Sequence, residues 1–152
     1  MSWAEIQKER LVPWFYAAIF AVINSDGKIL VEDRVSPESG HFGYTIIPGG
    51  AIEEGETPRQ ALEREMDEEL GVKPTQFTKL PVFLDMTLSN RFVEYSPYVV
   101  LAVNGEVANK EPGKSRHRWI DLEEACNLPL ALDQLVAVRV KEYLVQEGLI
   151  QG

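Results

Sequence analysis

Cysteine and histidine are scarce in this sequence. Cys126 is the single cysteine among 152 residues, so the chain cannot form a disulfide bond within itself. Its two histidines are too few for a Cys/His cluster with the spacing of a zinc site. A chain of this length can bury roughly 68–70% of its unfolded surface, so it needs no such staple to build a core. These absences exclude a disulfide-stabilised mini-protein and favour a reducing, cytoplasmic setting.

Long hydrophobic runs and linkers are absent as well. The longest apolar stretch, residues 11–23, is shorter than the roughly 20 residues that cross a bilayer, so no membrane association is expected. Glu5 and Glu9 dilute the positive charge that would precede the core of a signal peptide. No repeat, low-complexity tract or Pro/Gly/Ser-rich segment divides the chain. We therefore expect one domain over residues 1–152, with a helical N-terminal extension at residues 1–12.

Basic residues are outnumbered by acidic ones. The chain has 15 lysines and arginines against 24 aspartates and glutamates, which gives a formal net charge of −9 at pH 7. Such a field disfavours binding to long nucleic acids, because that binding depends on neutralising phosphates with lysine and arginine. The excess is concentrated in residues 53–69, where eight acids accompany only Arg59 and Arg64. A carboxylate block this dense is either a solvated helix face or a divalent cation site.

The pattern of apolar and turn residues predicts a mixed α and β fold. Strands are expected at 15–23, 28–31, 44–47, 77–87, 91–103 and 118–121, a loop at 35–43, and helices at 2–10 and 132–145. The first two strands would form a hairpin through an Asp-Gly turn, and residues 77–87 would pair with residues 91–103. We expect helices packed on a mostly antiparallel or mixed sheet.

A further helix is predicted between Thr57 and Gly71. Leu62, Met66 and Leu70 recur every fourth residue, which is the spacing of one apolar helix face. A proline follows Thr57 at a first-turn position, and a glycine is a common terminating residue. The segment is therefore an amphipathic helix.

Three acids on this helix form the strongest candidate site. Glu65, Glu68 and Glu69 stand at positions i, i+3 and i+4, so their carboxylates should converge on one face. Like charges at this spacing repel, so a compensating positive charge is expected. Hard oxygen ligands favour Mg²⁺ or Mn²⁺, and a magnesium site with few carboxylates usually recruits phosphate oxygens of a substrate. The block therefore points to phosphate chemistry.

Neighbouring residues could complete such a site. Gly49 and Gly50 would let the backbone approach a metal or a phosphate closely. Arg64 can tie the helix to Glu56 in the preceding loop through a bidentate ion pair, which would orient the segment. Other acids of the block are interpreted as solvated surface residues, namely Glu53, Glu63 and Asp67.

Residues 50–72 match a longer signature, Gly-x5-Glu-x7-Arg-Glu-U-x-Glu-Glu-x-Gly-U, where U is apolar. The matching residues are Gly50, Glu56, Arg64, Glu65, Met66, Glu68, Glu69, Gly71 and Val72. By this motif and the order of its predicted elements, the sequence resembles the Nudix hydrolase family. The resemblance implies an α/β/α sandwich with a mixed sheet, whose loop-helix-loop motif at residues 49–72 binds divalent cations.

The same resemblance implies a ligand set and a reaction. Glu65, Glu68 and Glu69 would be metal ligands, assisted by the carbonyl of Gly49 or Gly50. The reaction would be hydrolysis of a nucleoside diphosphate linked to a further group.

Such hydrolysis needs a base that takes a proton from the attacking water. Glu68 or Glu69 could serve, although members of the family often use an acid in a distal loop before a strand. Glu111 is the best-placed acid of that kind. An ordinary exposed loop acid is an equally good interpretation of Glu111, because loop geometry cannot be read from the sequence.

The substrate is less closely defined by the residues. Tyr44 either lines a substrate pocket or packs inward, and Arg34 and His41 either meet phosphate or base or belong to a surface loop. The sequence lacks the features that the resemblance associates with ADP-ribose, dinucleoside polyphosphate, NADH and coenzyme A hydrolases. A nucleoside triphosphate or similar small nucleotide is therefore the expected substrate, and a homodimer is left open.

Two other function classes are compatible with the sequence. A Nudix-like module could bind nucleotides as a sensor without turning them over, but such modules tend to lose motif glutamates that are all present here. An acidic scaffold without metal is the other, and it predicts no rise in melting temperature on adding Mg²⁺ or Mn²⁺. A catalytically active hydrolase is therefore the favoured hypothesis.

Overall fold

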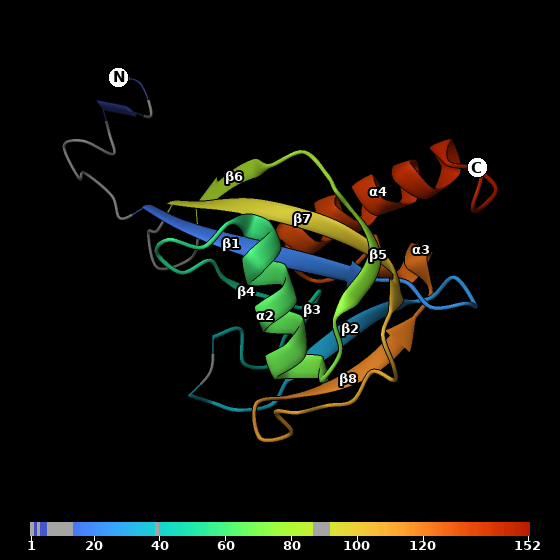
Figure 1. Ribbon diagram of the computed structural model, residues 1–152, viewed down its shortest axis with the longest axis horizontal. Coiled ribbons are helices and arrows are strands. Elements are labelled where there is room, and N and C mark those ends of the chain that lie inside the picture. Colours follow the sequence, from blue (N-terminus) through green and yellow to red (C-terminus); the bar gives the residue numbers. More distant parts are fainter. Residues whose placement is uncertain (1, 3, 6–13, 39, 87–91) are drawn as a thin grey trace.

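The computed structural model describes residues 2, 4–5, 14–38, 40–86 and 92–152 (Figure 1). Its elements are, in chain order, β1 (Trp14–Val22), β2 (Ile29–Arg34), β3 (Thr45–Ile46), β4 (Gly49–Ala51), α2 (Pro58–Leu70), β5 (Pro74–Lys79), β6 (Phe83–Met86), β7 (Phe92–Val103), β8 (Ser115–Ile120), α3 (Leu122–Ala125) and α4 (Ala131–Gln146). The predicted helix at 2–10 lies mostly outside the described residues.

These strands form two sheets. In the five-stranded sheet the order is β4-β1-β7-β5, and β6 also pairs with β7. The three-stranded sheet has the order β3-β2-β8. β1 and β7 run parallel, whereas every other paired strand in the two sheets is antiparallel. The prediction of a mixed sheet is thus confirmed.

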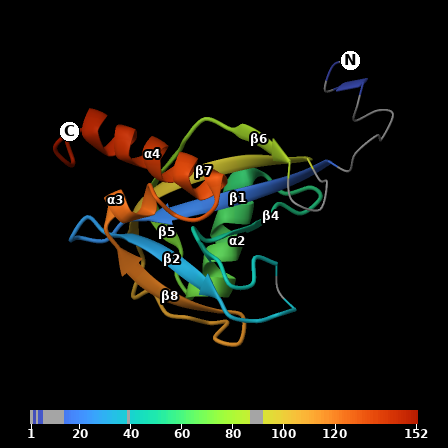
Figure 2. The same ribbon diagram turned by 180° about the vertical axis from the view of Figure 1, so that it is seen from behind.

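Helices cover both faces of the larger sheet. α2 lies on the near face in Figure 1, and α4 lies on the opposite face, which Figure 2 turns toward the viewer. The alternation of β1 explains this arrangement, because successive side chains of a strand point to opposite faces. Phe20 packs in a core with Leu62 and Met66 of α2, whereas Ile19 packs in a second core with Val136 of α4. The α/β/α sandwich is therefore confirmed.

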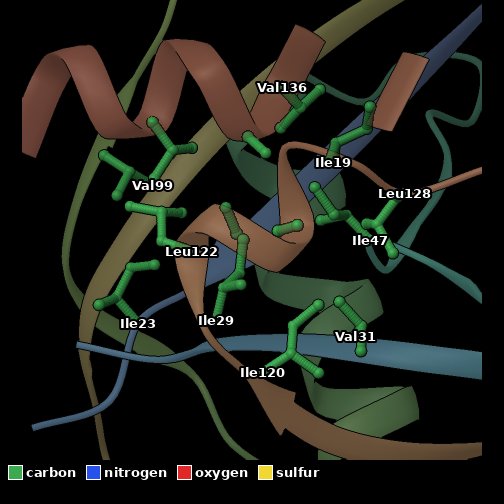
Figure 3. Packing of buried hydrophobic residues seen from close by; sticks show 14 of the residues in the cluster. Ile19, Ile23, Ile29, Val31, Ile47, Val99, Ile120, Leu122, Leu128 and Val136 are labelled. Atoms are coloured by element: carbon green, nitrogen blue, oxygen red, sulfur yellow. The ribbon is translucent and has the colours of Figure 1, made fainter. Parts of the chain in front are cut away.

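The second core also joins the two sheets. Figure 3 shows that Ile29, Val31 and Ile120 of the smaller sheet belong to the same core as Ile19 and Val99 of the larger one, with Leu122 among them. Apolar side chains on the same face of β2 and β1 close the gap between the sheets below α4. This packing fixes the smaller sheet, which carries several residues of the site described below.

The predicted first hairpin is correct only at its turn. The Asn24 side chain accepts hydrogen bonds from the Asp26 and Lys28 amides, and Ile23 and Ile29 form a single antiparallel bridge. Beyond that bridge β1 and β2 separate into different sheets. The prediction that they pair along their length is wrong, because each strand has apolar residues on both faces and finds other partners.

Two further boundaries differ from the predictions. The single strand predicted at 77–87 is replaced by two strands, β5 and β6, which are separated by residues 80–82. Pro81 in this gap has no amide hydrogen to give to a ladder. Both still pair with β7 as expected, and residues 87–91 lie outside the described part of the chain. The strand β4 after Pro48 and the short helix α3 were not predicted. β8 and α4 confirm the strand at 118–121 and the helix at 132–145.

The motif helix α2 agrees closely with the prediction. Thr57 caps its N-terminus by accepting a hydrogen bond from the Gln60 amide, and the Gln60 side chain accepts one from the Thr57 amide in return. Pro58 occupies the first turn, and Gly71 ends the helix in the left-handed conformation. α2 is thereby held in register with the loop that precedes it.

Gly49 permits the close pairing of β4 with β1. A Cβ at this position would lie 2.5 Å from the Ala18 carbonyl oxygen, a backbone atom that cannot move without shifting β1. We expect Gly49→Ala to lower the free energy of unfolding by about 1–3 kcal/mol, as overpacking does, in urea titrations. Gly113→Ala is the matched control, because a Cβ there meets no atom of the described residues within 4 Å. Equal stability of the two variants would contradict this account.

Candidate functional site

Three segments meet along the motif helix. α2 supplies the predicted carboxylates, β4 brings Gly50 against Glu65, and the loop between β7 and β8 brings Lys114 against Glu69. The segments are far apart in the sequence, and the two sheets hold them together. This is where the motif residues gather.

Arg64 is the most extensively bonded side chain of the site. Its Nε and Nη2 donate to the two carboxylate oxygens of Glu56 at 2.7 and 3.0 Å, so the bidentate pair expected from the sequence is present. Nη2 also donates to the Ala51 carbonyl at 2.9 Å, and Nη1 donates to Glu65 at 2.9 Å and to Glu68 at 3.3 Å. The hydrogen bonds from Arg64 hold the pKa of the Glu56 carboxyl below its usual range. Arg64 thus joins β4, the loop and α2.

Glu69 is the most deeply buried of the motif carboxylates, with 2% of its surface exposed. One oxygen, Oε1, accepts a hydrogen bond from Lys114 Nζ at 2.8 Å. The other, Oε2, is buried and has no hydrogen-bond partner among the described residues. Burial, together with the negative charges of Glu32 and Glu65, raises the pKa of Glu69 to about 7, although Lys114 acts in the opposite direction. An unpaired buried carboxylate oxygen is costly, so it calls for a positive ligand.

The surroundings of Glu69 suit a hard divalent cation. The nearby donors are carboxylate oxygens, which are the ligands that Mg²⁺ and Mn²⁺ prefer. Gly50 leaves room for the Glu65 carboxylate, since a Cβ at residue 50 would lie only 2.4 and 2.5 Å from its oxygens. Burial raises the pKa of Glu65 as well, although Arg64 opposes the shift. The residues present therefore fit such a cation.

The carboxylates do not converge as closely as the helical spacing predicts. Within the described ranges, no three Asp, Glu, His or Cys side chains are already grouped to hold a metal ion. Glu65 and Glu68 turn toward Arg64, and Glu69 turns toward Lys114. The compensating positive charge expected from the sequence is thus supplied by two side chains of the protein itself.

Glu111, the predicted base, lies in the same region. Its carboxylate is 3.5 Å from Lys114 Nζ, so a single ammonium contacts both Glu69 and Glu111. Its backbone is fixed, because its amide donates to the Asn109 side chain and its carbonyl accepts from the Lys114 amide. The structure therefore brings this distal loop acid to the motif helix.

A cavity of about 810 Å³ lies next to Gly49 and Gly50. All three residues predicted to bind substrate line it, namely Arg34, His41 and Tyr44. Aromatic rings from β1, from the loop before β3 and from β7 surround it, including Phe15, Tyr16, Phe42 and Tyr95. The alternative in which Tyr44 packs inward is wrong, because its side chain is on the cavity wall and 38% of it is exposed.

Arg34 and His41 are held at one side of this cavity. Arg34 Nη1 donates to the buried carboxylate of Glu32 at 3.3 Å. His41 has a φ of 65°, an uncommon conformation for a residue with a side chain. Burial, and then the positive charge of Arg34, lowers the pKa of His41, so the ring favours its neutral form. A cation and a neutral imidazole therefore face the cavity together.

Sequence reasoning missed three residues of this region. Glu32 is 1% exposed within β2; its pKa is lowered in spite of burial by His117 and Arg34. Lys114 carried no signal beyond its place near Glu111. Asp133 lies in the first turn of α4, where its Oδ1 accepts from the Ile47 amide at 2.9 Å. Its Oδ2 is buried, with no hydrogen-bond partner in the described part of the chain. An acid at the start of a predicted helix was the signal that could have found it.

Comparison with known proteins agrees with the fold and the motif. The family model for the NUDIX domain matches residues 13–141. The CTP pyrophosphohydrolase of Escherichia coli is 33% identical over 116 residues, covering 74% of this chain and 81% of that protein. The 8-oxo-dGTP diphosphatase of the same organism is 30% identical over 125 residues, covering 79% of this chain and 92% of that protein.

A solved structure has the same fold. The MutT NUDIX hydrolase from Burkholderia pseudomallei superimposes with a TM-score of 0.73 at 23% identity, covering 84% of this chain and 98% of that one. The chain therefore belongs to the Nudix hydrolase family, whose members generally use divalent metals. In the part of the chain that the structure describes, no helix has the length and apolar character to span a bilayer.

Asp133 should make stability depend on pH. Burial is the main reason why its pKa is raised to about 6 from an ordinary value of 3.8. The folded state therefore holds this proton more tightly than the unfolded state, and the resulting stabilisation is lost as pH rises through about 6. Relative to Asp133→Asn, wild type should lose on the order of 2 kcal/mol between pH 4.5 and 7.5, at 1.36 kcal/mol per pKa unit.

Urea titrations of both proteins across this range measure the difference. Asp26→Asn, in the exposed first turn, serves as a control for the loss of one negative charge. A difference between wild type and Asp133→Asn that stays constant with pH would contradict the raised pKa.

Proposed function

We propose that this protein is a divalent-metal-dependent pyrophosphohydrolase that cleaves a phosphoanhydride bond in a nucleoside diphosphate derivative, most simply a nucleoside triphosphate. Glu65, Glu68 and Glu69, with the carbonyl of Gly49 or Gly50, would hold Mg²⁺ or Mn²⁺. The observation that carries the proposal is the unpaired, buried Oε2 of Glu69, which lies on the motif helix beside hard oxygen donors.

A cation held there would neutralise charge on the phosphoryl oxygens and acidify the attacking water. Arg64 would orient the ligands, because its Glu56 and Ala51 contacts fix it while its Nη1 reaches Glu65 and Glu68. Glu111 would accept the proton of the attacking water as the general base. Its position next to the ammonium that also contacts Glu69 supports this role.

The cavity beside Gly49 and Gly50 would bind the nucleoside. Aromatic walls suit a stacked base, and Tyr44 would contribute to them. Arg34 would meet a phosphate and His41 a phosphate or the base. Asp133 would present its unpaired Oδ2 to a donor group of the base, since it lines the same cavity. The names of the E. coli relatives, which act on CTP and 8-oxo-dGTP, support a small nucleotide as the substrate.

A non-catalytic nucleotide-binding module is the alternative. It would use the same cavity, but it gives no reason for the carboxylates on α2 or for Glu111 beside them. A screen of nucleoside triphosphates, dinucleotides and nucleotide sugars, with phosphate or pyrophosphate release measured beside calorimetric binding, separates turnover from binding. Hydrolysis of a true substrate in ¹⁸O-water then identifies the phosphorus that is attacked. Binding without release of either product would favour the module.

The motif carboxylates should be essential for turnover. We expect hydrolysis to cease when divalent metal is removed by a chelator, and Glu68→Gln or Glu69→Gln to lower kcat by about a hundredfold or more. Circular dichroism should show an unchanged fold. Glu63→Gln is the matched control on the same helix, because the Glu63 carboxylate pairs with Arg59 rather than with the site. Near wild-type turnover in both Glu68→Gln and Glu69→Gln would refute the catalytic assignment.

Glu111 can be tested separately from the metal. If it is the general base, Glu111→Gln should reduce kcat by roughly 10²–10⁴-fold, while KM and metal affinity change little. Glu106→Gln, in the same loop but exposed, should leave kcat close to that of wild type. An unchanged kcat in Glu111→Gln would assign the base to another acid, such as Glu68 or Glu69, without affecting the metal site.

A further inference from the structure

Two cations of the protein neutralise the carboxylates of the site, and they are held very differently. Arg64 donates to Glu56 twice and to the Ala51 carbonyl, in addition to its contacts with Glu65 and Glu68. These anchors lie outside the predicted ligand set. Arg64 can therefore keep its position whatever else binds Glu65 and Glu68.

Lys114 has no such anchor among the contacts that the structure describes for its ammonium. Its Nζ contacts Glu69 at 2.8 Å and Glu111 at 3.5 Å, and both partners are acids of the proposed site. The side chain is 30% exposed, so the ammonium has a route to solvent. Four flexible bonds separate it from a backbone that is itself fixed by hydrogen bonds to Val35 and Glu111.

The position of Lys114 is that of a counter-ion. Glu69 is buried, and the charges of Glu32 and Glu65 lie close enough to act on it. Without a cation, this group of acids would repel one another in a region of low dielectric constant. The ammonium is bonded to Oε1 of Glu69, and the neighbouring Oε2 is the unpaired atom that supports the metal site.

We propose that Lys114 is a built-in counter-ion that competes with the divalent cation for Glu69 and must move away when the cation binds. The proposal rests on the metal site of the proposed function. It assigns Lys114 a regulatory role in metal affinity: the protein remains folded without metal because Lys114 neutralises Glu69, and its affinity for metal is lower for the same reason.

The size of the effect follows from the distance. An opposite charge within about 4–6 Å lowers the proton affinity of a carboxylate by 10- to 1,000-fold, and a metal cation at the same oxygens is repelled by the ammonium in the same direction. Removing the ammonium should therefore strengthen metal binding by about tenfold or more. A purely structural lysine would have no such effect, because disturbing Glu69 would weaken binding.

The test is a calorimetric titration of Mn²⁺ into the full chain stripped of metal, with wild type, Lys114→Met, Lys114→Arg and Lys110→Met compared. Lys110→Met is the matched control, since Lys110 lies in the same loop and is exposed, and its side chain packs near Gly71 rather than at Glu69. It corrects for the loss of one positive charge from the loop. Thermal unfolding with and without Mn²⁺ provides a second readout.

We expect Lys114→Met to bind Mn²⁺ at least about tenfold more tightly than wild type and than Lys110→Met. Lys114→Arg should restore weak binding. Without metal, Lys114→Met should melt below wild type, because it leaves Glu69 without its counter-ion, and Mn²⁺ should raise its melting temperature by more.

Unchanged or weaker Mn²⁺ binding in Lys114→Met would overturn the proposal and leave the proposed function standing if wild type still binds the metal. If Lys114→Met does not fold, Lys114→Gln replaces it in the test. We expect the same tighter Mn²⁺ binding for Lys114→Gln, and unchanged or weaker binding would again overturn the proposal. Absence of saturable Mn²⁺ binding in wild type would instead overturn the metal site and this proposal together.

Discussion

The close approach of the backbone at Gly49 and Gly50 is the constraint on which the site depends. Gly49 lies so near the Ala18 carbonyl that the position has no room for a side chain, and a Cβ at Gly50 would displace the Glu65 carboxylate. β4 can therefore pair closely with β1, and α2 packs against both strands. Arg64 then bonds to the Ala51 carbonyl one residue further on. The ion pairs of the site thus depend on the backbone positions of Gly49 and Gly50.

Charge balance explains why the acids can be gathered at all. The helix places three carboxylates on or near one face, and the smaller sheet adds Glu32 from behind. Repulsion among them is offset by a rigid guanidinium on one side and a flexible ammonium on the other. Glu65 and Glu68 are paired with the rigid Arg64, and Glu69 is paired with the flexible Lys114. The two groups of acids therefore differ in how readily a metal ion can replace the cation of the protein.

The sequence was most informative where local rules decide the structure. The first-turn Pro58, the apolar stripe of α2 and the bidentate Arg64–Glu56 pair follow from spacings of a few residues, and all are present. Glu32 was overlooked because a charge after an apolar run looks like a strand end, yet it is 1% exposed, with His117 of β8 3.4 Å from its carboxylate. The prediction that β1 pairs with β2 was wrong for a related reason. The sheet that each strand joins depends on partners elsewhere in the chain.

The parallel pairing of β1 with β7 also bears on how the molecule assembles. Trp14 is in register with Phe92, so the central pair of the larger sheet closes a loop that contains the entire motif helix. During synthesis, α2 emerges from the ribosome well before β7 exists, and the face it covers is then incomplete. Long-range pairings of this kind close late because loop entropy opposes them. The acidic motif is thus made early in translation and acquires its surroundings, including the loop that carries Lys114 and Glu111, only near the end.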